Sequence, residues 1–135
     1  MTEIEITAEE AEEVKMDQDY EYFASENLKI QTMEGELVPF EINDVQRVLQ
    51  AIIEDIREKD RLVRLVILKA RREGVSTYFT GRFYWKTTRN FNRYSMLITH
   101  EPEATDFLFG MCKRYQAHNE FRPQEKYNNK KMLEF

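Results

Sequence analysis

Apolar residues recur with the spacing of a helix in three segments of the chain. In residues 45–60 they fall every three or four positions, which places them on one helical face. The members of that face are Val45, Val48, Leu49, Ile52, Ile53 and Ile56. Asn43 or Asp44 can cap this helix, because either side-chain oxygen can accept from a backbone N–H of the first turn. Two further helices are predicted over residues 75–89 and 102–118.

The same spacing predicts the buried faces of the two later helices. Phe79, Phe83 and Tyr84 are expected to face inward in the first of them. Pro102 suits the first turn of the second, where its missing N–H leaves no hydrogen bond unmade. The apolar set of the second helix is Ala104, Phe107, Leu108, Met111, Cys112 and Tyr115.

Short continuous apolar runs lie before two of these helices. Residues 64–68 and 94–101 are of this kind, which is typical of strands buried on both faces of a parallel sheet. Residues 28–42 suggest two extended pieces around a turn at Gly35. Pro39 restricts the second piece to an edge or a loop, because proline cannot donate to a strand ladder.

The order strand, helix, strand, helix indicates a βαβ pattern with a right-handed crossover. We therefore predict an α/β fold of parallel strands with flanking helices. Ligands in such sheets bind beyond the carboxyl ends of the strands, where loops enter helices. Residues 69–75 lie at such a place. Met132 and Leu133 are candidates for the start of a further strand.

The composition limits the class of protein. A chain of 135 residues with 41% hydrophobic residues fits one domain with a core of its own. The single cysteine cannot form an internal disulfide. The chain shows no apolar segment of a signal peptide and no apolar run of membrane-spanning length, so we expect a protein that is neither secreted nor inserted in a membrane.

The net charge of −5 is unevenly distributed. Residues 1–27 hold ten Asp or Glu and one Lys, whereas residues 28–135 hold 15 acids and 19 bases. We expect residues 1–21 to be an acidic leader that stays mobile or forms one exposed helix. This leader is either a solvated tail or a docking site for a partner. The domain itself is predicted to span residues 22–135.

Three cations and a glycine separate the predicted strand 64–68 from the predicted helix 75–89. The cations are Lys69, Arg71 and Arg72. A helix N-terminus leaves backbone N–H groups unpaired and attracts anions. Gly74 can adopt a positive φ and lets a ligand approach the backbone closely. Ser76 and Thr77 add hydroxyls, one of which could bind a metal ion held by a phosphate. The sequence predicts a polyphosphate site here, and the alternative is an ordinary strand-to-helix turn with solvated arginines.

The spacing approaches that of a Walker A loop, G-x-x-x-x-G-K-[ST], with two departures. Gly74, Val75 and Ser76 occupy the G-K-S positions, so Val75 stands where the lysine belongs. Lys69 stands five residues before Gly74, where the first glycine belongs. The cation has moved from one end of the loop to the other, from where it can still reach the same phosphates.

A longer stretch resembles a known family. "RLVILKARREGVST", preceded by "VPFEINDVQRVL" and followed by "FYWKTTRNFNRYSMLITHEPEATDFLFGMCKRY", resembles the start of the ATPase domain of phage large terminase subunits. These are motors that package DNA into capsids, and several branches carry the Walker lysine at the beginning of the loop. The resemblance covers about residues 22–135. It implies part of a three-layer P-loop NTPase-like fold, ATP and Mg²⁺ as ligands, and a phage or prophage origin.

The resemblance implies roles for individual residues. Lys69 corresponds to the shifted Walker lysine, and Arg71 or Arg72 to an arginine that stabilises the transferring phosphate. Gln46 matches a glutamine that reads adenine, with Phe40 as a stacking surface.

The remaining implied roles belong to the start of the helix. The backbone of Gly74, Val75 and Ser76 would wrap the phosphates, with Thr77 beside them. The hydroxyl of Ser76 would bind Mg²⁺.

Members of this family continue to a Walker B strand that ends in Asp-Glu, a coupling motif and a nuclease domain. No apolar run ending in Asp-Glu follows the loop here. Hydrolysis needs a second hold on the metal and a carboxylate that orients the attacking water. We therefore expect the N-terminal piece of a longer ATPase, either excised or the product of a truncated prophage gene, that hydrolyses ATP poorly or not at all by itself. The implied partners are double-stranded DNA, the small terminase subunit and the portal protein, in the host cytoplasm.

A second hypothesis is a non-catalytic interaction module that binds no nucleotide. In it, the acidic leader or a basic and aromatic cluster docks a motor partner or DNA. The cluster comprises Arg82, Lys86, Arg89, Arg93, Tyr84, Trp85 and Phe91. The same aromatics could instead belong to the core. His100, His118 and Cys112 lack the spacing of zinc ligands, and Cys112 is predicted to be a core residue.

Overall fold

The computed structural model describes residues 6–129 and 132–135, which form five helices and two small sheets. The helices are α1 (Ala8–Gln18), α2 (Tyr20–Asn27), α3 (Asp44–Glu58), α4 (Val75–Thr88) and α5 (Pro102–His118). The strands are β1 (Lys29–Gln31), β2 (Leu37–Pro39), β3 (Tyr127–Asn128) and β4 (Leu133–Glu134). Each sheet is one antiparallel pair, β1 with β2 and β3 with β4.

This architecture overturns the predicted parallel-strand, P-loop NTPase-like fold. Residues 61–70 and 93–99 are extended but belong to no strand. The backbone of residues 62–68 forms no hydrogen bond with another described residue. Leu65 and Ile67 pack against the core, whereas Val66 and Leu68 are fully exposed. A strand of a parallel sheet needs a ladder partner and cover on both faces. This segment has cover on one face and no ladder partner among the described residues.

A matched pair of leucines tests this one-sided burial. We expect Leu65→Ala to lower the free energy of unfolding by about 1–2 kcal/mol, below the range for fully buried leucines because Leu65 is only partly buried. Leu68→Ala should change it by less than about 0.5 kcal/mol, since the side chain meets solvent all round. Urea unfolding of both variants measures the difference. Equal losses would show that both leucines are covered in solution.

The three predicted helices are confirmed, and local signals mark the starts of α3 and α5. Asn43, not Asp44, caps α3: its side chain accepts from the N–H of Gln46, whose side chain in turn accepts from the N–H of Asn43. Pro102 occupies the first turn of α5 as predicted. The turn at Gly35 is also confirmed. It connects β1 to β2, and Gly35 adopts a φ of 88° there.

The predicted inward faces are only partly correct. Leu49 and Ile53 of α3 are buried, but three of the apolar residues predicted to share their face are exposed, namely Val45, Val48 and Ile52. In α4 the buried aromatics are Tyr78, Tyr84 and Trp85. Helical periodicity shows which residues share a side of a helix, but the neighbouring elements decide how much of that side is covered.

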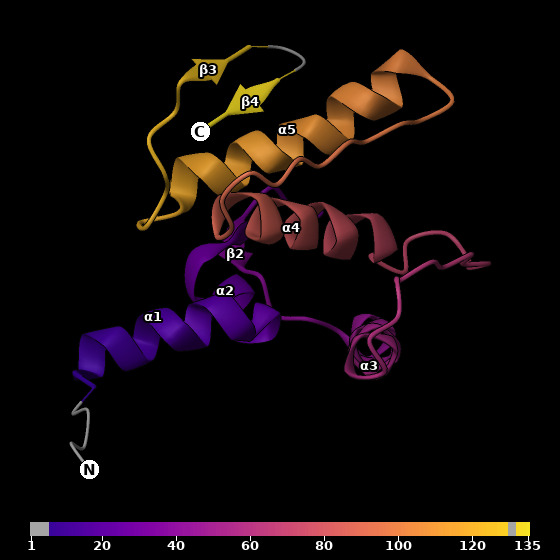
Figure 1. The fold of residues 1–135 in the computed structure, drawn as a ribbon. Coiled ribbons are helices and arrows are strands. Elements are labelled where there is room, and N and C mark those ends of the chain that lie inside the picture. The colour runs from indigo at the N-terminus through magenta and orange to yellow at the C-terminus, as the bar shows by residue number, and fades with distance from the viewer. Residues whose placement is uncertain (1–5, 130–131) are drawn as a thin grey trace.

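Helix α4 lies at the centre of the fold. Figure 1 shows it between α5 on one side and α1 and α2 on the other, with α3 seen along its axis. Tyr20 donates from its hydroxyl to the carbonyl of Tyr78 at 3.0 Å, and Trp85 donates from Nε1 to the carbonyl of Met16 at 2.7 Å. These two bonds join the N-terminal helices to α4 through buried side chains.

The acidic leader forms helix α1 from residue 8 onward. Thr7 and Glu10 make a capping box at its start, and Met16 is buried. Met16, Glu13 and Asp17 of this helix contact Trp85 and Arg89, at the end of α4. Residues 1–5 of the leader lie outside the described residues. Within the described residues no helix has both the length and the apolarity needed to cross a bilayer.

Candidate phosphate-binding loop

The segment from Lys69 to Thr77 leads from the extended residues into α4. It contains two residues with positive φ, Arg72 at 64° and Gly74 at 74°. Gly74 directly precedes the first residue of α4. A Cβ added at Gly74 would lie 2.7 Å from Nε2 of Gln46 and 3.2 Å from Nδ2 of Asn43. Glycine is therefore required at this position for two reasons: the backbone has a positive φ, and α3 leaves no room for a side chain.

The start of α3 contacts this loop directly. Gln46 donates from Nε2 to the carbonyl of Gly74 at 2.8 Å. Asn43 donates from Nδ2 to the carbonyl of Glu73 at 3.4 Å. The residues that cap α3 thus also bind the two carbonyls just before α4. Sequence reasoning missed Asn43 as a loop contact, because the residues that meet are about 30 positions apart and only the local capping pattern is visible.

The first backbone N–H groups of α4 are unpaired. The first hydrogen bond of the helix runs from the N–H of Tyr78 to the carbonyl of Gly74, at 3.0 Å. Among the described residues, nothing accepts from the N–H groups of Gly74, Val75, Ser76 or Thr77, and no side chain caps this helix. These four donors, together with the positive end of the helix dipole, form an environment suited to an anion.

The cations predicted from the sequence are part of this loop. Lys69, Arg71 and Arg72 are exposed. Lys69 donates only to the neighbouring carbonyl of Ala70, at 3.2 Å. No ion pair in the described part of the chain involves any of the three. Ser76 is exposed, Thr77 is half-buried, and the side chain of Val75 is buried, so Val75 can offer only its amide.

The residues assigned to the adenine are placed differently. Phe40 is 1% exposed and stacks on Tyr115, with ring centroids 6.4 Å apart and planes inclined by 5°. Gln46 is 3% exposed, and both ends of its amide are engaged, Oε1 by Asn43 and Nε2 by Gly74. Neither side chain is free to meet a base in this conformation. The phosphate-binding candidates from Lys69 to Thr77 lie in one continuous segment, whereas Phe40 and Gln46 have structural roles.

The donor set fits phosphate better than it fits a metal ion. No group of three His, Cys, Asp or Glu side chains that could hold a metal ion occurs in the described residues. Ser76 is the one hydroxyl that is exposed in the first turn of α4. A Mg²⁺ ion at this loop would therefore depend on phosphate oxygens, with the Ser76 hydroxyl as its protein ligand.

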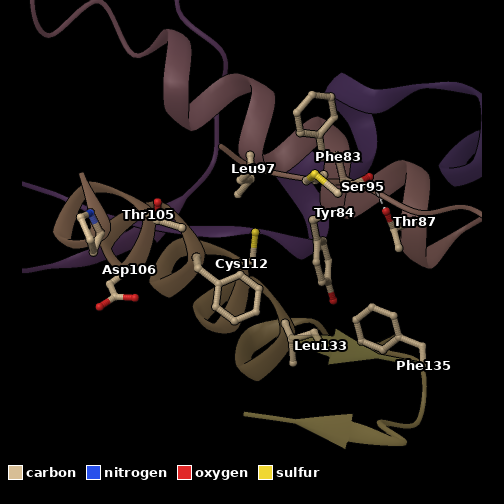
Figure 2. A pocket seen from close by; sticks show the side chains of 13 residues that line it. Phe83, Tyr84, Thr87, Ser95, Leu97, Thr105, Asp106, Cys112, Leu133 and Phe135 are labelled. Atoms are coloured by element: carbon tan, nitrogen blue, oxygen red, sulfur yellow. Dashed lines mark hydrogen bonds between the residues drawn. The ribbon is translucent and has the colours of Figure 1, made fainter. Parts of the chain in front are cut away.

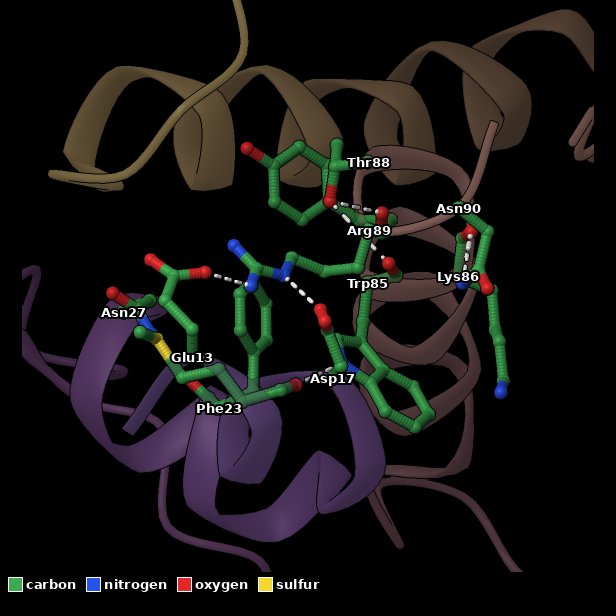
Figure 3. Close-up of polar contacts among 11 residues, drawn as sticks. Glu13, Asp17, Phe23, Asn27, Trp85, Lys86, Thr88, Arg89 and Asn90 are labelled. Atoms are coloured by element: carbon green, nitrogen blue, oxygen red, sulfur yellow. Dashed lines mark hydrogen bonds and ion pairs between the residues drawn. The ribbon is translucent and has the colours of Figure 1, made fainter. Parts of the chain in front are cut away.

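Most of the basic and aromatic cluster serves the interior. Arg89 binds Glu13 and Asp17 of α1, as Figure 3 shows. Arg82 is 5% exposed and pairs with Glu54 of α3 at 2.8 Å. These contacts fasten α1 and α3 to α4, and they leave few cations of the cluster for DNA.

The remaining cations of the cluster differ in exposure. Lys86 lies over the Trp85 ring, 4.3 Å from its centroid, and burial together with the charges of Arg57 and Arg82 lowers its pKa. Arg93 and Phe91 are exposed. Only these last two members of the cluster are exposed.

A cavity of about 540 Å³ lies between α4, α5 and the C-terminal strand β4. Figure 2 shows the Cys112 sulfur pointing from α5 toward Leu97, with Tyr84 and Phe135 nearby. Burial raises the pKa of the Cys112 thiol to about 12, so the thiol stays protonated at neutral pH. The predicted role of Cys112 as a packing residue fits this environment.

No family model, curated protein or solved structure matches the chain.

Proposed function

We propose that residues 69–77 bind the phosphates of a nucleoside triphosphate. The observation that carries the proposal is the set of four unpaired N–H groups at the start of α4, behind a glycine with φ of 74°. Three exposed cations without ion-pair partners in the described residues support it. The proposal rests on this loop and not on a parallel sheet.

The sequence resemblance extends the proposal to a biological role. In it, the chain is the ATP-binding N-terminal segment of a phage terminase large subunit, and ATP with Mg²⁺ is the ligand. Lys69 and Arg71 or Arg72 neutralise the phosphates, and Ser76 binds the metal ion. The described residues supply no carboxylate cluster for the metal. The segment by itself therefore binds ATP without hydrolysing it efficiently.

The partners and location follow from the same role. The complete motor acts on double-stranded DNA, together with a small terminase subunit and a portal protein, in the host cytoplasm. Arg93 is exposed and forms no ion pair with a described residue, so contact with DNA is expected there.

Binding of Mg-ATP and of Mg-free tripolyphosphate tests the proposal. At a ligand concentration 100 times the Kd, we expect stabilisation of about 2.7 kcal/mol, which corresponds to a rise in Tm of roughly 10 °C. Lys69→Ala should weaken binding by roughly 10- to 100-fold, the loss of one charge-assisted hydrogen bond. Calorimetry gives the affinities.

Lys126→Ala is the matched control, because Lys126 is exposed on the segment before β3. It should leave the affinity unchanged. If neither ligand raises Tm in the wild-type protein, the proposal fails. Equal losses in the two lysine variants would mean that binding depends on general positive charge and not on this loop.

The second candidate is the interaction module without nucleotide. It is favoured by apolar side chains that two extended segments leave exposed, at Val66, Leu68, Tyr94, Met96 and Ile98. Exposed apolar residues of this kind are common at protein–protein contacts. Concentration-dependent self-association or partner capture, without any response to ATP, would favour this candidate.

A further inference from the structure

We infer that Asn43 and Gln46 position the phosphate-binding loop, in addition to capping α3. The inference rests on the proposed function of residues 69–77. It gives Gln46 a role different from the adenine contact that the resemblance implied. In this role the two side chains turn loop carbonyls inward, so that the N–H groups of Gly74 and Val75 point outward to the ligand.

The side-chain amides of Asn43 and Gln46 each accept one hydrogen bond and donate another. Gln46 accepts at Oε1 from the N–H of Asn43 (2.9 Å), and Asn43 accepts at Oδ1 from the N–H of Gln46 (2.9 Å). Each side chain then has its NH₂ group left to donate. Gln46 donates to the carbonyl of Gly74 at 2.8 Å and Asn43 to the carbonyl of Glu73 at 3.4 Å.

These hydrogen bonds fix the direction of both amide groups. If the Gln46 amide were reversed, its NH₂ would face the N–H of Asn43 and its oxygen would face the carbonyl of Gly74. Both contacts would then join like groups, two donors or two acceptors. At 3% exposure, Gln46 has little access to water that could compensate.

The geometry of the trans peptide links the direction of each loop carbonyl to the direction of the next N–H group. The described residues contain no cis peptide bond. In a trans peptide, the C=O of one residue and the N–H of the next point in opposite directions. A Glu73 carbonyl held toward Asn43 directs the N–H of Gly74 away from α3. The Gly74 carbonyl accepts both from Nε2 of Gln46 and from the N–H of Tyr78, and the N–H of Val75 points to the opposite side of that peptide.

The closeness of α3 also accounts for glycine at this point. A Cβ at position 74 would lie only 2.7 Å from Nε2 of Gln46, which is closer than two such atoms can approach. Glycine thus allows Gln46 to reach the carbonyl, and Gln46 in turn stabilises the positive φ that places the N–H groups. A ligand on these N–H groups should therefore stabilise the start of α3 as well.

Three neutral variants test this role by tripolyphosphate affinity and by the ¹H–¹⁵N shifts of Gly74 and Val75. Gln46→Met removes the donor to Gly74. Asn43→Ser keeps a good N-cap for α3 but cannot place the same NH₂ group at Glu73. Gln50→Met is the control, because Gln50 lies one turn further along α3 and accepts from the hydroxyl of Tyr78 instead.

We expect Gln46→Met to weaken tripolyphosphate binding by about three- to tenfold, the loss of one neutral hydrogen bond. Asn43→Ser should weaken it by a smaller factor while Tm stays within a few degrees of wild type. In both variants the ligand-induced shifts of Gly74 and Val75 should shrink. Gln50→Met should match wild type in affinity and in these shifts.

The outcomes separate the two proposals. If wild-type protein binds tripolyphosphate, and both Gln46→Met and Asn43→Ser bind it equally well with unchanged shifts, the positioning role is overturned and the phosphate loop stands. If wild-type protein does not bind, the proposed function fails and the positioning role fails with it. If Gln46→Met does not fold, Asn43→Ser decides, because it retains the cap.

Discussion

Trp85→Ala is expected to lower the free energy of unfolding by about 3–5 kcal/mol, the range for a buried tryptophan replaced by alanine. Trp85 is 1% exposed and its ring centroid lies 5.4 Å from that of Tyr20. Its Nε1 donates to the carbonyl of Met16, so the substitution also leaves a buried acceptor of α1 without its donor. Because Trp85 joins α1 to α4, we expect loosening of α1 to accompany the loss.

Urea unfolding measures the change, and amide hydrogen exchange in residues 8–18 reports on α1. Phe91→Ala is the matched control, since Phe91 is an aromatic residue that is 99% exposed. It should change the free energy of unfolding by less than about 0.5 kcal/mol. Trp85→Phe keeps an aromatic ring and loses the hydrogen bond, so its cost should fall between the two. A Trp85→Ala variant as stable as Phe91→Ala would contradict the packing of α1 on α4.

Gly81→Ala is expected to destabilise the protein by about 1–3 kcal/mol, although alanine is the better helix former. Gly81 lies in the middle of α4, where a Cβ would collide with the Tyr20 hydroxyl and lie 3.0 Å from Cε1 of Phe40. The Tyr20 hydroxyl cannot retreat without giving up its bond to the carbonyl of Tyr78. The cost of overpacking therefore outweighs the gain in helix propensity of about 1 kcal/mol.

Gly110→Ala provides the opposite case in the same chain. Gly110 lies in α5, and a Cβ there would meet no atom within 4 Å. Helix propensity alone then applies, so this variant should gain up to about 1 kcal/mol. Urea unfolding of the two variants should give changes of opposite sign. Stabilisation by both substitutions would mean that Tyr20 of α2 and Phe40 do not pack on α4 as described.

The candidate site was predictable in its phosphate-binding half. Lys69, Arg71, Arg72 and Gly74 are near one another in sequence, and the start of α4 can be placed from local signals. The other half depends on contacts between distant segments. Phe40 is a core residue and not a surface for adenine, because Tyr115, 75 positions later, stacks on it. Gln46 contacts the loop because the carbonyl of Gly74 lies within hydrogen-bond distance of its Nε2.

The sequence by itself determined the three long helices, the proline at the start of α5 and the glycine turn between β1 and β2, and it narrowed the cap of α3 to Asn43 or Asp44. Each of these depends on residues within about four positions, where helical spacing and backbone preferences act directly. Only the tertiary structure decided that residues 64–68 and 94–98 remain outside any sheet. An apolar run becomes a strand only when another strand accepts its backbone hydrogen bonds, and that partner is not specified by the run itself.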